Sequence, residues 1–388
     1  MARSVYFAIT CLLSAVLSFF ELGGHLVAAN PGRPSILLGR NCTINEHPDV
    51  SDLAGASYVP HVRAARLPSG RTYRYVHYPP HGPEKLTVLF LHGFPSSAYD
   101  WRRQFAYFAA LGYGVLAPDL LGYGGTDKPA DVGAYTLKNQ AREIVELLDC
   151  AGVGMVLSVG HDLGSPLLSR IATYYPTLST KYVFLDIGYD APPLVDLTAA
   201  GIAALNAQTL ATEGYEPLGY WSFFNETGAG RVLDTHQDSF WSISYTDNDP
   251  VYWKTVFGPT GLLEAFVKAN KRAPVGGFVS IEDEAVHNHI FAPERGGYEP
   301  ALNHYRALYR DLNLQDENAI PKSATNLTKP VLLLTAAKDP IGTPARAERS
   351  TRPYAPALRV QEIDSGHFMM LEKADEVNKA INEFFENE

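Results

Sequence analysis

The sequence predicts an α/β protein whose mostly parallel sheet is flanked by helices and interrupted by a mainly helical insertion. Three observations predict this class. Short apolar runs alternate with helical patterns from about residue 86 onward, as in successive βαβ units. The alternation stops near residue 190 and resumes near residue 330. Several apolar runs end in turns that carry aspartate or histidine, and ligands bind at such strand ends in open α/β sheets.

The first half of the chain supplies the early strands. The segment "RTYRYVHY" (71–78) alternates in polarity like a half-buried strand. The run "LTVLFLHG" (86–93) is continuously apolar, as expected of a parallel strand covered on both faces. A helix is expected from about 97 to 111, and a strand with a glycine-rich loop follows in "GVLAPDLLGYGGT". Helical periodicity then begins after Thr136, a residue type that favours the N-cap.

The second half completes the sheet around an insertion. A strand begins at Val156, a helix runs to about 175, and "KYVFLDIG" (181–188) is the next strand. Residues 190–325 are rich in aromatic residues, proline and glycine and contain no clear buried strand. We expect a helical cap there, above the carboxyl edge of the sheet. The runs "PVLLLTAAKDP" and "LRVQEIDSGH" and a closing helix, "ADEVNKAINEFFE", resume the alternation.

The N-terminus differs in character from the rest. Arg3 precedes an apolar run, and small residues follow at Val27–Ala29, which is the pattern of a secretory signal peptide over residues 1–29. The alternative is an uncleaved membrane anchor, but the run is shorter than the roughly 20 residues that a span needs. We therefore expect a secreted chain without a membrane span after cleavage. The hydrolytic core would occupy residues 30–189 and 326–388, and the cap residues 190–325.

Two further features fit a secretory route. Asn-x-Ser/Thr acceptors begin at Asn41, Asn225 and Asn326, which makes these residues candidates for glycosylation. Cys11 would leave with the signal peptide, so Cys42 and Cys150 remain. An oxidising compartment permits a disulfide between them, and two free buried thiols are an equal alternative.

The overall composition excludes several classes of partner. The 388 residues are 46% hydrophobic and carry a formal net charge of −10 at pH 7, which supports a large core and disfavours nucleic acid and anionic membranes as partners. No cysteine–histidine cluster has the spacing of a structural zinc site. His287 and His289 lack an obvious third ligand, so we expect no metal and no other cofactor.

The segment "GHDLG" (160–164) follows a predicted strand and has the G-x-S-x-G spacing of a nucleophile elbow. Asp162 occupies the place of the serine. A carboxylate exposed at this bend can attack an electrophilic carbon and form an ester. The alternative role of Asp162 is a helix N-cap, but the flanking glycines and the preceding strand favour the nucleophile.

The segment "HGFPSS" (92–97) directly follows another predicted parallel strand. In an elbow of this kind, such a loop donates one backbone N–H to an oxyanion hole, and the residue after the nucleophile donates the other. The donors would be Phe94 and Leu163. An ordinary turn is the alternative.

The partners of the nucleophile are expected near the C-terminus. His367 follows the last apolar strand, and Asp339 follows "VLLLTAAK". The order nucleophile, acid, histidine matches the order of triads built on such elbows. Asp339 would fix the imidazole tautomer, and His367 would take a proton from water. Asp186 and Asp364 are rival acids.

The combination of "GHDLG", "HGFP", "KDP" and "SGH" resembles the epoxide hydrolases of the α/β-hydrolase superfamily, over about residues 60 to 385. The resemblance implies the α/β-hydrolase fold with a cap, a reaction without cofactor, and two cap tyrosines that grip the epoxide oxygen. Tyr220 in "GYWSFFNETG" and Tyr305 in "ALNHYRALYR" match by local context. Tyr215 and Tyr245 lie near Tyr220 in sequence, and a packing role is the alternative for either match.

The expected function is therefore the opening of a small apolar epoxide to a vicinal diol. Asp162 would open the ring and become an ester, which water activated by His367 and Asp339 would hydrolyse. Leu163 stands where many relatives have Trp. This departure argues against the runner-up, a haloalkane dehalogenase, which needs a halide-binding donor there. A non-catalytic ligand-binding protein of the same fold is a third hypothesis, although all the expected catalytic groups are present.

Overall fold

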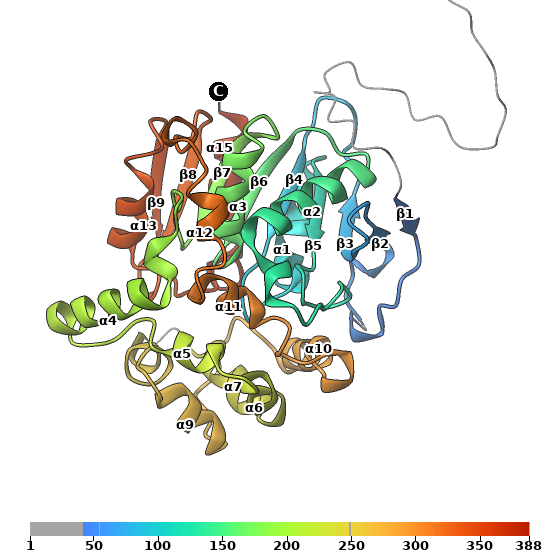
Figure 1. Ribbon diagram of the computed structural model, residues 1–388. Helices are drawn as coiled ribbons and strands as arrows, with labels where there is room; N and C mark the ends of the chain where they lie inside the picture. The colour runs from blue at the N-terminus through green and yellow to red at the C-terminus, as the bar shows by residue number, and fades with distance from the viewer. Residues whose placement is uncertain (1–41, 54, 248–249, 388) are drawn as a thin grey trace, which may run out of the picture. The chain divides into compact units, whose positions relative to one another are not determined.

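A mixed nine-stranded sheet organises the described part of the chain, with the strand order β1-β2-β3-β5-β4-β6-β7-β8-β9. The computed structural model describes residues 42–53, 55–247 and 250–387. Pairing is antiparallel from β1 to β5 and parallel from β5 to β9, as Figure 1 shows. The predicted α/β class is confirmed. The strands are β1 (Thr43–Asn45), β2 (Val62–Arg66), β3 (Thr72–Tyr78), β4 (Thr87–Leu91), β5 (Gly114–Pro118), β6 (Val156–His161), β7 (Ser179–Leu185), β8 (Val331–Ala336) and β9 (Leu358–Ile363).

Burial on both faces explains why the sequences of the central strands are continuously apolar. Every residue of β4, β5, β6 and β8 is buried, because helices cover both faces of a parallel sheet. Strand β9 lies at the edge, and most of its residues are partly or fully exposed. The central strands therefore form the buried centre of the sheet, and their carboxyl ends lie along one edge of it.

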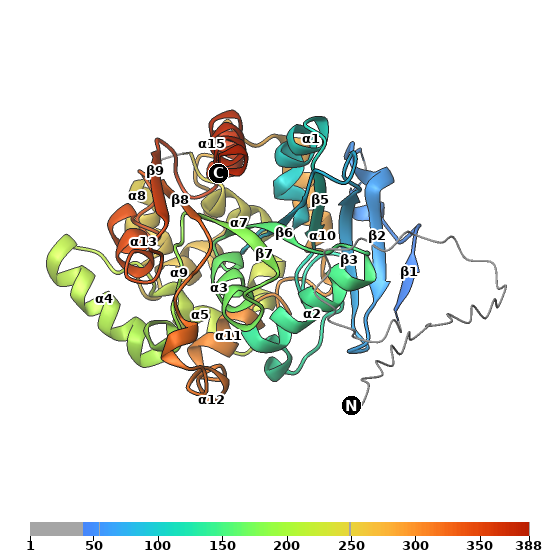
Figure 2. The ribbon, with the colours of Figure 1, turned by 90° about the horizontal axis from the view of Figure 1, so that it is seen from above.

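The helices of the core form a layer on each face of the sheet (Figure 2). Helices α1 and α15 pack together on one face, and α2 and α3 pack together on the other. The bounds of the core helices are α1 (Arg102–Ala110), α2 (Leu137–Cys150), α3 (Gly164–Tyr174), α13 (Pro344–Thr351), α14 (Met369–Glu372) and α15 (Ala374–Glu386). Each contributes an apolar face to one contiguous buried cluster.

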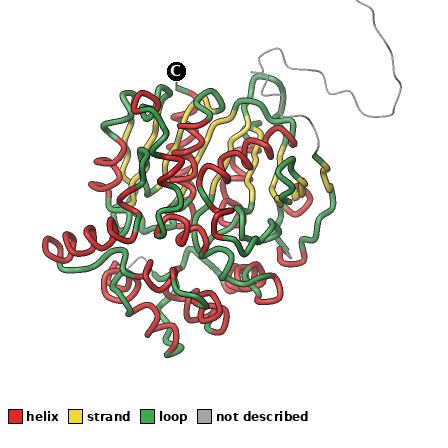
Figure 3. The backbone as a smooth tube through the Cα atoms, viewed as in Figure 1, coloured by secondary structure: helices red, strands yellow, loops and turns green. Residues whose placement is uncertain are grey.

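The described residues between β7 and β8 form helices joined by loops and no strand, apart from one isolated bridge between Thr246 and Val275. Figure 3 shows most of this segment as helices and loops beyond one end of the strands. Its helices are α4 (Ala199–Glu213), α5 (Tyr220–Asn225), α6 (Ala229–Thr235), α7 (Gln237–Ser244), α8 (Pro250–Tyr252), the π-helix Trp253–Phe257, α9 (Leu262–Lys268), α10 (Ile281–Ile290), α11 (Asn303–Tyr309) and α12 (Leu314–Glu317).

Two local features differ from the sequence analysis. Strands β1 and β2 were not expected, because they are only 3 and 5 residues long and β2 contains two arginines. Helix α2 begins at Leu137, but the Thr136 side chain does not cap it. Instead, the side-chain oxygen of Asn313 accepts a 2.7 Å hydrogen bond from the Leu137 N–H, and Asn313 lies too far along the chain for a local pattern to reveal it.

Features linked to the secretory route fall partly outside the described residues. The predicted signal peptide, residues 1–29, and the acceptor Asn41 lie there. Asn326 is exposed, whereas the side chain of Asn225 is half-buried and accepts a 2.6 Å hydrogen bond from Arg310. Cys42 and Cys150 are free thiols in partly buried positions. In the part of the chain that the structure describes, no helix is long and apolar enough to cross a membrane.

Candidate active site

The nucleophile elbow joins β6 to α3. Asp162 lies between the two elements with a φ of 50°, in the left-handed region that non-glycine residues rarely adopt. The glycine at 164 is required here, because a Cβ on it would lie 2.2 Å from the Leu91 carbonyl oxygen. The tight contact lets α3 begin directly against the sheet. The bend directs the Asp162 carboxylate outward, with its side chain 13% exposed.

Backbone donors hold one oxygen of this carboxylate. The Phe94 N–H donates a 2.7 Å hydrogen bond to Oδ1 of Asp162, and the Leu163 N–H lies close enough to the carboxylate to lower its pKa. The approach depends on Gly93, because a Cβ at that position would lie 2.1 Å from Oδ1. The structure thus brings both predicted oxyanion donors to Asp162.

The charge of Asp162 reflects opposing influences. Burial raises the pKa of the Asp162 carboxyl above its ordinary value, and this effect outweighs the lowering by His367 and by the N–H groups of Leu163 and Phe94. Partial desolvation makes a carboxylate more reactive as a nucleophile. The N–H donors also keep it ionised over a wider range than burial alone would permit.

His367 and Asp339 lie beside the nucleophile, as the sequence predicted. His367 follows β9, and its Nδ1 lies 2.7 Å from Oδ2 of Asp339. Its Nε2 lies 3.8 Å from Oδ2 of Asp162. Asp339 accepts a further 2.6 Å hydrogen bond from the Ile341 N–H. Because Nδ1 donates to Asp339, Nε2 is the nitrogen that is available on the side of the nucleophile.

The pKa values of Asp339 and His367 are shifted in opposite directions. Burial on its own raises the pKa of Asp339, but His367 and the Ile341 N–H bring it down to about 2. Burial lowers the pKa of His367, but the acidic neighbours raise it well above its ordinary value. The pair is therefore suited to stabilising an imidazolium at Nε2.

The two rival acids differ in position. Asp186 ends β7 with a φ of 66°, is completely buried, and places Oδ2 3.0 Å from Nδ1 of His367. Asp364 is exposed and forms an ion pair with Lys338 at 2.7 Å. Of these two, only Asp186 reaches the imidazole, so Nδ1 of His367 has two acidic neighbours, Asp186 and Asp339.

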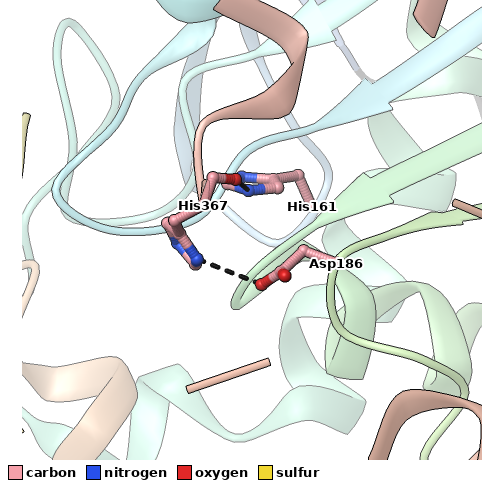
Figure 4. Close-up of side chains that lie close together, drawn as sticks. All are labelled: His161, Asp186 and His367. Atoms are coloured by element: carbon pink, nitrogen blue, oxygen red, sulfur yellow. Dashed lines mark hydrogen bonds and ion pairs between the residues drawn. The ribbon is translucent and has the colours of Figure 1, made fainter. Parts of the chain in front are cut away.

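Among the described residues, His161, Asp186 and His367 form a group whose ligand atoms lie within 4.8 Å of one another (Figure 4). Such spacing can suit a metal ion. However, Nδ1 of His367 is engaged by Asp339, and Nε2 of His161 lies 2.8 Å from the His367 carbonyl oxygen. Two of the four imidazole nitrogens in this group are therefore already engaged, whereas Nδ1 of His161 and both oxygens of Asp186 have no hydrogen-bond partner among the described residues.

The two predicted tyrosines approach the elbow from the inserted segment. Tyr220 of α5 and Tyr305 of α11 are 5% and 2% exposed, and their ring centroids are 6.1 Å apart. Tyr305 also packs edge-on against Phe94, with centroids 5.3 Å apart. Burial and the nearby Asp162 charge raise the pKa of both hydroxyls. They therefore remain protonated donors in an apolar setting.

The other tyrosines near Tyr220 in sequence have different partners. The Tyr215 hydroxyl donates to the Pro340 carbonyl oxygen at 2.7 Å. The Tyr245 hydroxyl lies 2.9 Å from Oδ2 of Asp100 and 3.0 Å from the carbonyl oxygen of Pro95. Both tyrosines connect the inserted segment to loops of the core, which separates them from Tyr220 and Tyr305.

One residue near the nucleophile was missed by the sequence analysis. Tyr123 is 1% exposed, its hydroxyl has no hydrogen-bond partner among the described residues, and burial together with the Asp162 charge raises its pKa well above the ordinary value. Its place in the glycine-rich loop after β5 was the available signal, but a glycine-rich loop does not specify which side chain faces the site.

A small cavity of about 30 Å³ lies beside the imidazole. Polar side chains of Asp339, Glu372 and His367 line it together with the aromatic rings of Trp253 and Phe278. A cavity of this size with polar groups in its lining has room for a water molecule.

Comparison with known proteins identifies the architecture. A family model described as "alpha/beta hydrolase fold" matches residues 87–215. The chain has the α/β-hydrolase fold. This α/β hydrolase is 27% identical to Epoxide hydrolase srdG of Neurospora crassa over 321 residues, which cover 77% of this chain and 86% of that protein. It is also 27% identical to Epoxide hydrolase A of Mycobacterium tuberculosis, over 78% of this chain and 91% of that protein.

Solved structures give the same result. The epoxide hydrolase from an endophytic Streptomyces superposes with a TM-score of 0.67 at 26% identity, covering 84% of this chain and 94% of that one. Epoxide Hydrolase A from Mycobacterium thermoresistibile superposes with a TM-score of 0.65 at 25% identity, covering 83% and 97% of the two chains. The predicted resemblance of this α/β hydrolase to the epoxide hydrolases is confirmed.

Proposed function

We propose that this α/β hydrolase is an epoxide hydrolase that converts an apolar epoxide to a vicinal diol through a covalent ester on Asp162. The arrangement around the two carboxylate oxygens of Asp162 carries the proposal. Oδ1 accepts the Phe94 N–H at 2.7 Å, whereas Oδ2 lies 3.8 Å from His367 Nε2. One oxygen is held, and the other is available to attack a carbon atom.

Ring opening is the first step. Oδ2 of Asp162 forms a bond to an oxirane carbon while the bond from that carbon to the oxirane oxygen breaks. The oxygen gains charge and takes a proton from the Tyr220 or Tyr305 hydroxyl. Because burial raises the pKa of both hydroxyls, the proton stays on the tyrosine until the oxirane oxygen becomes sufficiently basic.

Ester hydrolysis is the second step. Esterification removes the charge of Asp162, which lowers the affinity of His367 for a proton and prepares Nε2 to act as a base. Water transfers a proton to Nε2 and attacks the carbonyl carbon, and the resulting oxyanion at Oδ1 is held by the Phe94 and Leu163 N–H groups. Each such donor stabilises a transition state by about 3–4 kcal/mol. Collapse breaks the ester bond, and the leaving alkoxide takes the proton from Nε2 to complete the diol. The proton on the regenerated Asp162 carboxyl then returns to the tyrosinate, which restores the starting state.

A product assay tests this function. Purified protein is incubated with styrene oxide and with a fatty epoxide, and the diols are detected by mass spectrometry. We expect diol from at least one epoxide and none from the Asp162→Asn variant. Equal diol from wild type and variant, or none from any epoxide, would refute the proposal.

We further propose that residues 1–29 direct secretion, that residues 190–325 act as a lid, and that Asn326 is glycosylated. Asn326 is exposed, whereas the Asn225 side chain is bonded to Arg310, so Asn326 is the more accessible of these two acceptors. Expression in a secreting eukaryotic host should give mature protein in the medium. Glycosidase treatment should lower its mass, and the decrease should be smaller in an Asn326→Gln variant. Retention inside the cells or an unchanged mass would contradict these proposals.

A further inference from the structure

We propose that Asp186 is a positioning residue of the catalytic base: its carboxyl group stays protonated and donates a hydrogen bond to Asp339. His367 then faces a pair of carboxyl groups that carries a single negative charge. The inference deepens the proposed function and rests on it for its kinetic consequences. Its structural content, a buried protonated carboxyl at the end of β7, can be tested without turnover.

The side chains of Asp339 and Asp186 both approach one atom, Nδ1 of His367. Nδ1 of His367 lies 2.7 Å from Oδ2 of Asp339 and 3.0 Å from Oδ2 of Asp186. Nδ1 has only one hydrogen to donate. The contact with Asp339 has hydrogen-bond geometry, whereas neither oxygen of Asp186 accepts a hydrogen bond within the described residues. Asp339 is therefore the acceptor of the imidazole proton, and Asp186 is its close neighbour.

The backbone holds Asp186 firmly in this place. Its own N–H donates a 2.8 Å hydrogen bond to the Leu334 carbonyl oxygen, and its φ is 66°. The loop after Asp339 closes over the carboxyl at Gly342, where a Cβ would lie 2.4 Å from Oδ2 of Asp186. The side chain is completely buried, so water does not solvate its charge.

Two buried carboxyl groups that both lie within 3.0 Å of one imidazole nitrogen cannot both ionise readily at moderate pH. Asp339 holds the charge, since the Ile341 N–H and the imidazole both donate to it and its pKa falls to about 2. Burial and the Asp339 charge raise the pKa of Asp186 well above its ordinary value. The shared proton consequently belongs to Asp186, whose carboxyl can donate it to Asp339, and each side chain shifts the pKa of the other.

The proposed hydrogen bond from Asp186 to Asp339 lowers the pKa of the catalytic base, His367. By donating to Asp339, Asp186 withdraws negative charge from the oxygen that supports the imidazolium, so His367 releases its proton more readily during ester hydrolysis. It also fixes the orientation of the Asp339 carboxylate. The titratable groups that face Asp186 are His161 at the end of β6, Asp339 after β8 and His367 after β9. Farther out, Arg346 and Glu372 act on Asp339.

The protonation state can be measured directly. We would compare infrared spectra at neutral pH of wild type, Asp186→Asn and a matched control, Asp364→Asn, which removes an exposed carboxylate near the same histidine in sequence. The expected result is a carbonyl stretch of a protonated carboxylic acid that is present in wild type and in the control and is lost in Asp186→Asn. The same band in all three proteins, or in none, would overturn the proposal.

The pH dependence of kcat distinguishes an effect of Asp186 on the pKa of His367 from a purely structural role. Asn at 186 keeps a neutral donor to Asp339, so the acid limb of the kcat–pH profile should stay in place. Ala removes the donor, so the acid limb should move to higher pH and kcat at neutral pH should fall about 10- to 100-fold with KM unchanged. If the acid limb of the Asn variant moves to lower pH, Asp186 is charged in wild type and the proposal is wrong. An Ala variant with the wild-type kcat–pH profile would also overturn the proposal.

Two controls address the possibilities that a variant does not fold and that the wild type is inactive. Thermal unfolding of each variant is measured first; if Asp186→Ala does not fold, the Asn profile and the infrared band still decide. If wild type forms no diol from any epoxide, the proposed function fails, and the infrared comparison alone then tests the protonated carboxyl of Asp186.

Discussion

The main-chain N–H of Phe94 donates a 2.7 Å hydrogen bond to Oδ1 of Asp162, and this contact distinguishes the two oxygens of the nucleophile. Oδ1 is held where negative charge would develop during ester hydrolysis. Oδ2 lies 3.8 Å from Nε2 of His367 and is free to form the ester bond. The loop that carries Phe94 therefore acts on the second chemical step, although it lies 68 residues before Asp162 in the sequence.

The approach of that loop depends on Gly93, so Gly93→Ala should strongly reduce activity. A Cβ would lie 2.1 Å from Oδ1 of Asp162, and both partners would have to move. Loss of one oxyanion donor lowers kcat by about 10²–10³-fold. Steady-state kinetics with an epoxide would measure the effect.

The matched control is Gly154→Ala, where nothing lies within 4 Å of the added Cβ and φ is not left-handed. This variant should keep wild-type kcat. Equal activity of the two variants would show that the close approach at Gly93 is not needed.

The tyrosine hydroxyls should act together in ring opening. Tyr305→Phe or Tyr220→Phe removes one of two proton donors, and the double variant should lose about 10²–10⁴-fold in the rate of ester formation. Single-turnover mixing would follow this rate. Tyr215→Phe is the control, since its hydroxyl binds the Pro340 carbonyl oxygen. A double variant that forms the ester at the wild-type rate would rule out this role.

The dependence of kcat/KM on pH should follow the shifted pKa values. Attack requires ionised Asp162, and burial raises its pKa above 3.8, so activity should fall in acid earlier than an exposed aspartate would predict. The tyrosines must stay protonated, and their pKa values lie above 10. Activity should therefore persist to about pH 10 on the alkaline side. An alkaline loss centred near neutral pH would be inconsistent with tyrosine donors of this kind.

Tyr245→Phe should destabilise the fold. Its hydroxyl lies 2.9 Å from Oδ2 of Asp100, and burial raises the pKa of this acid. The variant leaves Asp100 with one hydrogen bond fewer in a buried site, which costs about 1–3 kcal/mol. Urea unfolding would measure the loss. The control is Tyr107→Phe, because the Tyr107 hydroxyl makes no hydrogen bond within the described residues. Equal free energies of unfolding for the two variants would contradict the role of Tyr245.

Local patterns were sufficient to predict the elbow and the central strands. The apolar runs of β4, β6 and β8 reflect burial on both faces, and the glycine at 164 reflects a contact that leaves no space for a Cβ. For this reason Asp162, Phe94 and His367 could be placed at one edge of the sheet before any coordinates were known. Tyr220 and Tyr305 came from the resemblance to a family, since nothing in helical periodicity distinguishes them from packing residues.

Long-range contacts could not be predicted in the same way. Asp186 and Asp339 both follow apolar strands, and only the structure shows that both reach Nδ1 of His367. Asp364 is closer in sequence to the histidine but faces solvent and pairs with Lys338. Sequence order limits the candidates for the acid, whereas the packing of adjacent strands determines which of them reach the imidazole.

The central claim is that the diol forms through an ester on Asp162, and isotope labelling in a single turnover tests it most directly. Enzyme in excess over epoxide is mixed in ¹⁸O-water, and both the diol and the peptide that contains Asp162 are analysed by mass spectrometry. The account predicts unlabelled diol and one ¹⁸O atom in the Asp162 carboxylate, because water attacks the ester carbonyl rather than the epoxide. Labelled diol with unlabelled Asp162 would contradict it.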